Sequence, residues 1–278
     1  MAADGSGAVD GLIYDPAEVE RAAKLVILIP GALARLEIFA PVQHWRARGY
    51  ALVSCPFPGL DGRPVTPGLR IDAAAACIAE FAERHPGKPY RLLGYSTGGP
   101  IAISAAERMG DADVRVAAMS SAVERAGGIA TARRTTADLL AAAARVRSVR
   151  RRTVWLEYYK TLLFGRRVRR DSALDARATA LVAARMEEMV YPDRDLLAAH
   201  TEDLRRWRLP SGPRLAEDRL QFFVGAEDPV FSSPQTAALA ARFGAPRRHS
   251  YAGQGHLLFL TAPRVFEDIL AYFEAVPG

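Results

Sequence analysis

The sequence has few cysteines and no long hydrophobic run. Only Cys55 and Cys77 occur among its 278 residues, so a disulfide framework is not indicated. The longest aliphatic run, Leu25 to Ile29, has the length of a strand and is far shorter than the ~20 residues of a membrane span. The first residues lack the basic start and apolar stretch of a signal peptide. We therefore expect a cytoplasmic protein.

Motifs for metals and nucleotides are also missing. The chain contains neither C-x-x-C nor H-E-x-x-H and has no pair of histidines at ligand spacing, so we expect no metal site. A G-x-G-x-x-G motif does not follow the first aliphatic run, and no Walker-type loop is present. These absences argue against a nucleotide cofactor, and we expect no cofactor.

What the sequence does contain is an alternation of strand and helix patterns. Half of the residues are apolar and 24% are charged, a composition typical of a folded globular chain. Strands are expected at 24–29, 50–55, 90–93, 114–119, 220–224 and 247–251, and helices at 37–48, 71–84, 99–109, 234–243 and 263–273. This alternation predicts an α/β fold, with a mostly parallel central sheet and helices on both faces.

The alternation is interrupted near Ser121. The next ninety or so residues contain no convincing strand, and helices are expected at 131–145, 153–164, 172–190 and 194–208, the third with Ser172 as its N-cap. We therefore divide the chain into an α/β core, 1–120 and 213–278, and an all-helical cap insertion, 121–212.

The cap also carries the excess positive charge of the chain. Residues 121–212 hold 19 arginines and lysines against 11 acidic residues. We expect the arginine runs 145–152 and 166–170 to form a solvated helix face, and the alternative is attraction of an anionic substrate or surface. Most apolar cap residues should pack helix against helix and a minority should line a pocket; the candidates are Trp155, Tyr158, Tyr159, Leu162, Leu181, Met186 and Met189.

The strongest local motif is Gly94-Tyr95-Ser96-Thr97-Gly98-Gly99, which lies between a strand and a helix pattern. A serine hydroxyl is a weak nucleophile that needs an exposed position and a base within hydrogen-bond reach. A sharp strand-to-helix turn supplies the exposure, and small residues on both sides of the serine allow that turn. Ser96 is therefore the candidate nucleophile.

The base and its orienting acid are expected in two later loops. Among the five histidines, His256 lies in a Gly-rich loop after the last strand pattern, a place typical of catalytic groups. The other four lie elsewhere: His44 in a helix pattern, where a structural role is expected, His85 at a helix end, His200 on a helix of the insertion and His249 near the end of a strand. Asp228 follows a strand pattern at its carboxyl end and is favoured as the orienting acid over the adjacent Glu227, because only one of the two should reach His256.

The order Ser96, Asp228, His256 and the motifs around these residues resemble the α/β-hydrolase superfamily. The resemblance covers most of the chain outside 121–212, and a helical cap over the active site is common in that family. It implies an oxyanion hole made by the backbone amides of Thr97 and Ala32, with Leu33 as second choice for the latter. Pro30 stands where the family often has a histidine, which removes a side chain that usually braces this loop. Leu33, Tyr95 and Leu257 are expected to contact the substrate.

We therefore expect a serine hydrolase that cleaves a carboxylic ester or thioester of a small, largely apolar substrate through an acyl-enzyme. Acyl transfer and carbon–carbon bond hydrolysis use the same triad and stay open as alternatives. The alternative from another class is a catalytically silent member of the fold that binds a ligand or partner. The expected partner is a small-molecule substrate, without nucleic acid and without membrane contact, and the sequence leaves the oligomeric state open.

Overall fold

The computed structural model describes residues 11–65, 70–122, 128–208, 215–244 and 246–276. Its centre is one six-stranded sheet in the order β2-β1-β3-β4-β5-β6, with every neighbouring pair parallel. The strands are β1 (Lys24–Ile29), β2 (Tyr50–Ser54), β3 (Tyr90–Tyr95), β4 (Val114–Met119), β5 (Leu220–Gly225) and β6 (Arg248–Tyr251). All six strands fall where the sequence predicts them. The four central strands are buried almost throughout because helices cover both faces of the sheet.

One face of the sheet packs against the first group of helices, and their apolar side chains form one continuous core cluster with that face. This group consists of α1 (Pro16–Arg21), α2 (Ile71–Arg84), α3 (Gly98–Met109) and α8 (Ser233–Ala240), the last followed by η4 (Ala241–Phe243). Along each strand, residues of this cluster alternate with residues that point to the opposite face, as strand geometry requires. In β1, for example, Leu25, Ile27 and Ile29 face this group of helices.

The opposite face is covered by η1 (Leu36–Arg48) and α10 (Val265–Glu274), with the short α9 (Leu258–Thr261) preceding α10. The helix expected at 37–48 is a 3-10 helix rather than an α-helix. Pro41 lies inside it, and in an α-helix a proline ring clashes with the carbonyl four residues earlier. Trp45 of η1 packs edge-on against Phe273 of α10, so the two helices share one core.

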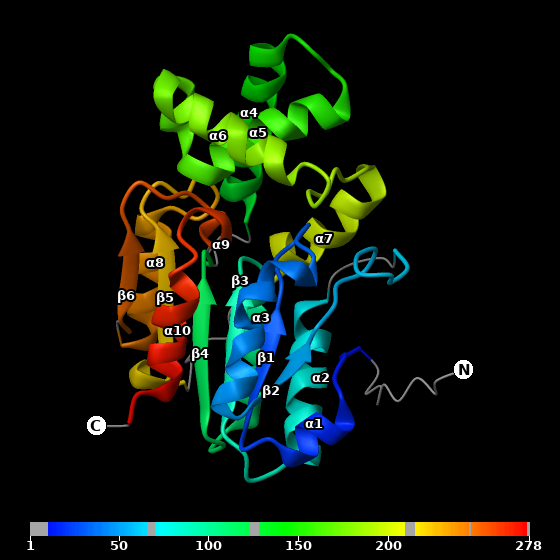
Figure 1. Cartoon of the computed structure of the whole chain (residues 1–278), viewed down its shortest axis with the longest axis vertical. Coiled ribbons are helices and arrows are strands. Elements are labelled where there is room, and N and C mark those ends of the chain that lie inside the picture. Colours follow the sequence, from blue (N-terminus) through cyan, green and yellow to red (C-terminus); the bar gives the residue numbers. More distant parts are fainter. Residues whose placement is uncertain (1–10, 66–69, 123–127, 209–214, 245, 277–278) are drawn as a thin grey trace.

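Between β4 and β5 the chain forms helices α4 (Ile129–Val146), α5 (Arg151–Phe164), α6 (Ser172–Arg185) and α7 (Arg194–Arg206), with η2 (Arg166–Arg169) after α5. Figure 1 shows this group, coloured green to yellow, above the carboxyl ends of the strands. The expected limits of the cap adjoin stretches outside the described residues, so the division at 121 and 212 stays a prediction.

Helix α6 differs from the sequence expectation at both ends. Its N-cap is Asp171 rather than Ser172, because the Asp171 carboxylate accepts a hydrogen bond from the Leu174 amide at 3.0 Å. The helix ends at Arg185 instead of continuing to Val190. The chain then turns toward the core, and both Met189 and Val190 are buried.

Three arginines of the two cap runs join helices of the cap, whereas most of the others are exposed. Arg166 and Arg169 both pair with the buried Asp138 of α4, at 2.9 and 2.7 Å. Arg145 bridges Glu157 of α5 and Asp175 of α6, at 3.1 and 3.0 Å. The expected solvated helix face therefore describes only some of the arginines, because Arg145, Arg166 and Arg169 connect α4, α5, η2 and α6.

Candidate active site

Ser96 lies on the sharp turn between β3 and α3. Its φ angle is 50°, in the left-handed region that non-glycine residues rarely adopt. A Cβ atom at Gly98 would collide with the carbonyl oxygen of Ile29, and one at Gly94 would collide with the carbonyl of Gly98. The turn therefore depends on the glycines on both sides of Ser96, which is the reason the sequence motif indicates it.

Hydrogen bonds from the neighbouring strand hold this turn in place. The Ser96 amide donates to the carbonyl of Met119 at 2.9 Å, and the Ser121 hydroxyl donates to the carbonyl of Ser96 at 2.6 Å. Because Met119 ends β4 and Ser121 follows it, the backbone of Ser96 is fixed from the sheet. The side chain is thereby held above the carboxyl edge of the sheet.

The structure brings Ser96, His256 and Asp228 together from three separate loops. His256 Nε2 lies 3.1 Å from Ser96 Oγ, and His256 Nδ1 lies 2.8 Å from Asp228 Oδ2. All three residues are buried. A carboxylate can only accept a hydrogen bond, so Nδ1 carries the proton and Nε2 is left to accept from the serine hydroxyl.

Asp228 rather than Glu227 faces the histidine. The other carboxylate oxygen of Asp228, Oδ1, accepts hydrogen bonds from the amides of Val230 and Phe231, at 2.8 and 2.9 Å. These bonds orient the carboxylate and compensate its burial. Glu227 is exposed to solvent. The geometry therefore supports the preference for Asp228, whose catalytic role stays a prediction.

The two amides favoured for the oxyanion hole are available. Neither the Thr97 amide nor the Ala32 amide has an acceptor among the described residues, and both residues line the cavity at Ser96. Leu33, the second choice, differs because its amide donates to Nδ1 of His200 at 3.0 Å. A donor already engaged in this way cannot also hold an oxyanion, so the geometry leaves Ala32.

The loop that carries His256 rests on the end of cap helix α5. The amides of Gly255 and His256 donate to the carbonyls of Leu163 and Leu162, at 2.8 and 2.6 Å. The last carbonyls of a helix have no partner within the helix, and here the histidine loop supplies one. The position of His256 thus depends on the cap as well as on the sheet.

A cavity of about 1160 Å³ opens above Ser96 and reaches into the cap. Its wall includes all three residues expected to contact the substrate, Leu33, Tyr95 and Leu257. Of the seven cap candidates, five line it, namely Trp155, Tyr158, Tyr159, Leu162 and Met189. The expectation that only a minority would do so is wrong, because the aromatic side chains of α5 border the cavity while they also pack in the core of the cap.

The tyrosines of this wall are neutral. Burial is the main cause that raises the pKa of Tyr95, Tyr158 and Tyr159 above the usual value near 10. The Tyr159 hydroxyl donates to the carbonyl of Val190 at 2.7 Å. These residues therefore contribute apolar ring surface and uncharged hydroxyl groups to the cavity wall.

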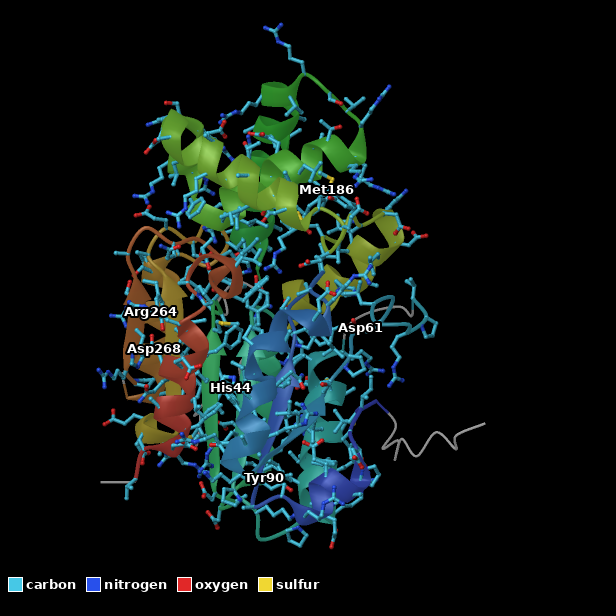
Figure 2. The ribbon with its side chains drawn as sticks, in the orientation of Figure 1. His44, Asp61, Tyr90, Met186, Arg264 and Asp268 are labelled. Carbon is cyan, nitrogen blue, oxygen red and sulfur yellow. The ribbon has the colours of Figure 1, made fainter. Side chains whose placement is uncertain are left out.

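Sequence reasoning placed His200 on a cap helix but missed its contacts, because it lies fully buried between α7 and the loops after β1 and β2. Two of the other histidines lie in different surroundings. His249 stacks on Phe223 with ring centroids 4.6 Å apart. His44 is exposed beside Glu267. Figure 2 shows His44 well below the cap, in which Met186 is labelled. A histidine in a helical pattern carries no sign of what it faces, so His200 gave no signal.

Two further findings concern the described residues as a whole. No group of three or more His, Cys, Asp or Glu side chains within these ranges is arranged to hold a metal ion. No helix within them combines the length and the apolar character that crossing a lipid bilayer requires.

Comparison with known families gives one match, and it spans most of the chain. The sequence model of the alpha/beta hydrolase family matches residues 26–269, a range that contains Ser96, Asp228 and His256. No curated protein sequence matches the chain.

Solved structures with the same architecture have little sequence in common with this chain. A hydrolase from Pseudomonas aeruginosa PA01 is 17% identical, with a TM-score of 0.67, over 95% of this chain and 93% of that one. An esterase from Exiguobacterium antarcticum is 16% identical, with a TM-score of 0.64, over 91% and 93%. Est816, described as an N-acyl homoserine lactone degrading enzyme, is 15% identical, with a TM-score of 0.60, over 89% and 92%. At these identities the likeness concerns the fold.

Proposed function

The chain belongs to the alpha/beta hydrolase family, and on this premise we propose that it is a serine hydrolase that cleaves carboxylic esters or thioesters through an acyl-enzyme at Ser96. The observation that carries the proposal is the placement of His256, with one ring nitrogen 3.1 Å from the Ser96 hydroxyl and the other 2.8 Å from the Asp228 carboxylate. This is the arrangement that converts a serine hydroxyl into a nucleophile.

In the first half of the reaction, Ser96 Oγ attacks the carbonyl carbon of the substrate. Nε2 of His256 takes the hydroxyl proton, and Asp228 stabilises the imidazolium that forms. The carbonyl oxygen becomes an oxyanion that accepts hydrogen bonds from the amides of Thr97 and Ala32. When the tetrahedral intermediate collapses, Nε2 returns the proton to the departing alcohol or thiol, and the acyl group stays on Ser96.

In the second half, a water molecule takes the place of the leaving group. His256 removes its proton as it attacks the acyl carbon, and the same two amides hold the second oxyanion. Collapse of this intermediate returns the proton to Ser96 Oγ and releases the carboxylic acid. Each half begins and ends with neutral His256, so the site needs no further proton source.

The cavity supports a largely apolar substrate and has room for one larger than the small substrate expected from the sequence. Its volume of about 1160 Å³ is somewhat larger than that of typical ligand pockets, about 300–1,000 Å³. Aromatic and aliphatic side chains form most of its wall, among them Trp155, Tyr159, Phe231 and Phe259. We therefore propose a substrate with a bulky or long apolar group, in place of the small substrate expected from the sequence.

Turnover of p-nitrophenyl esters from acetate to laurate tests this proposal. We expect hydrolysis of the longer esters, and Ser96→Ala should lower the rate by a factor on the order of 10⁴–10⁶. Product analysis separates the alternatives, because a hydrolase releases free acid whereas an acyltransferase needs a second acceptor. Ester hydrolysis by purified Ser96→Ala at more than a tenth of the wild-type rate would refute the proposal.

A further inference from the structure

The loop that offers the Ala32 amide is short and carries its own strained residue. The Ala34 amide donates to the carbonyl of Gly31 at 3.1 Å, which closes a tight turn. Within this turn Leu33 has a φ angle of 61°, a conformation that a branched side chain rarely adopts. Such a residue needs outside support to stay in place. Pro30, just before the turn, has no polar side chain to give it.

His200 of cap helix α7 provides that support. Its Nδ1 lies 3.0 Å from the Leu33 amide, and its Nε2 lies 2.6 Å from the carbonyl oxygen of Pro58. Among the described residues it is the side chain that hydrogen-bonds the backbone of 30–34. The histidine thereby joins three segments that are far apart in the sequence: the loop after β1, the loop after β2 and the cap.

The two contacts fix the protonation state of the ring. The Pro58 carbonyl can only accept a hydrogen bond, so Nε2 carries the proton, and the Leu33 amide can only donate, so Nδ1 carries none. His200 is therefore a neutral imidazole of one defined tautomer. Its complete burial agrees with this state, because burial disfavours the charged form. Phe57, with its ring centroid 5.9 Å away, covers the ring edge-on.

Helix α7 is itself anchored beside the cavity. Leu197 and Thr201, on the turns around His200, line the cavity wall, and Leu196 packs closely on Gly59, next to Pro58. The hydrogen bonds of His200 therefore start from a helix held on both sides. A side chain fixed in this way can hold the loop to which it is hydrogen-bonded in a defined position.

We propose that His200 is a positioning residue that holds the 30–34 turn so that the Ala32 amide points at the oxyanion formed on Ser96. This inference rests on the serine hydrolase function proposed above. Removing the support should let the turn relax away from Leu33's strained conformation and move the Ala32 donor. The effect should therefore fall on the transition state, where the oxyanion exists, and spare ground-state binding.

Two substitutions separate this role from a packing role. His200→Gln keeps one acceptor and one donor on a planar amide, whereas His200→Phe keeps a planar ring and loses both. We expect His200→Phe to lower kcat by about 10²-fold, near the loss caused by removing one oxyanion donor, with KM changed by less than about threefold. His200→Gln should recover most of kcat. The inhibition constant of an alkylboronic acid, which forms a tetrahedral adduct with a serine, should rise in parallel with the loss of kcat.

Circular dichroism and thermal melts show whether each variant is folded, and the less bulky His200→Leu replaces His200→Phe if the latter is not. Two results would overturn the inference while esters are still hydrolysed by wild type. One is an unchanged kcat and boronic acid affinity in the apolar variant. The other is an equal loss in kcat and in ground-state binding that His200→Gln does not rescue. If wild type itself neither hydrolyses esters nor binds the boronic acid, the proposed function fails instead.

Discussion

The His256 amide donates a 2.6 Å hydrogen bond to the carbonyl of Leu162, in the last turn of cap helix α5. The residue predicted to act as catalytic base is therefore bonded directly to the cap. Leu162 also lines the cavity, so the same turn of α5 contacts both the catalytic loop and the space for the substrate. The cap helices are therefore part of the scaffold of the candidate active site.

Gly165, at the end of α5, tests this dependence. Its φ and ψ angles are 76° and −176°, a region essentially confined to glycine, and a Cβ atom there would collide with the backbone of Glu227, beside Asp228. We expect Gly165→Ala to lower the free energy of unfolding by about 1–3 kcal/mol. Kinetic assays should show kcat reduced on the order of 10- to 10²-fold, because the Asp228 and His256 loops shift.

Gly87→Ala is the matched control for this substitution. Gly87 has a similar φ angle of 78°, but nothing lies within 4 Å of the position its Cβ would take. This variant should lose about 1–2 kcal/mol of stability and keep the wild-type kcat. Equal kcat values in both glycine variants would show that the end of α5 does not position the catalytic loops.

Asp228→Asn should damage catalysis much more than Glu227→Gln. An amide at position 228 can hold His256 in the wrong tautomer, and the analogous change costs about 10⁴-fold in kcat in a well-studied serine protease. Glu227 is exposed, so its substitution should change kcat by less than about threefold. A larger loss in Glu227→Gln, measured with the same ester, would mean that the acid is wrongly assigned.

Chain-length preference should respond to Met189 but not to Met186. Met189 lines the cavity and Met186 does not, although both are near the end of α6. Met189→Trp fills part of the cavity, so kcat/KM for a laurate ester should fall at least about 10-fold while the acetate ester changes little. Met186→Trp should leave the ratio of the two esters unchanged. If both variants shift the ratio equally, the cavity is not the acyl pocket.

Stability should fall as the solution becomes mildly acidic, in part because of His200. Burial is the main cause that lowers the pKa of this histidine below its usual value near 6.5, against a smaller opposing effect of the Pro58 hydrogen bond. The unfolded chain takes up a proton near pH 6.5, and the folded chain does so only at lower pH. The contribution of His200 to stability is therefore complete above about pH 7 and decreases as the pH falls below about 6.5, by at most about 1.4 kcal/mol per pH unit.

Urea unfolding of wild type and His200→Gln at pH values between about 7 and 5 measures this contribution. The slope of stability against pH should be shallower in the variant. It should not vanish, because burial also lowers the pKa of His85 and His249. Identical slopes in the two proteins would mean that His200 takes up its proton equally well in the folded chain.

The sheet and the serine turn could be predicted because their signals are local. Aliphatic runs identify buried strands such as Lys24–Ile29, and the glycines around Ser96 are required by the close approach of Ile29 and Gly98. The prediction for the end of α6 was wrong because no local signal marks it. Its apolar pattern continues past Arg185 into residues that are buried but lie outside the helix. Periodicity alone does not distinguish apolar residues buried on a helix face from apolar residues buried in the turn that follows.

The support of the active site by the cap could not be predicted. The hydrogen bond between Leu33 and His200 joins residues 167 positions apart, and the bond between His256 and Leu162 uses only backbone atoms. Backbone bonds leave no trace in residue types, and a buried histidine on a helix resembles any other histidine in the sequence. Only the packing of the cap on the sheet brings these groups together.

Labelling with a fluorophosphonate, followed by intact mass measurement and peptide mapping, shows whether Ser96 is an activated nucleophile. Such a probe phosphonylates a serine only where a base and an oxyanion hole activate it. We expect one adduct per chain, on Ser96, which is absent in Ser96→Ala and formed far more slowly in a His256→Ala variant. No adduct on the folded wild-type chain, or an adduct on a different serine, would contradict it.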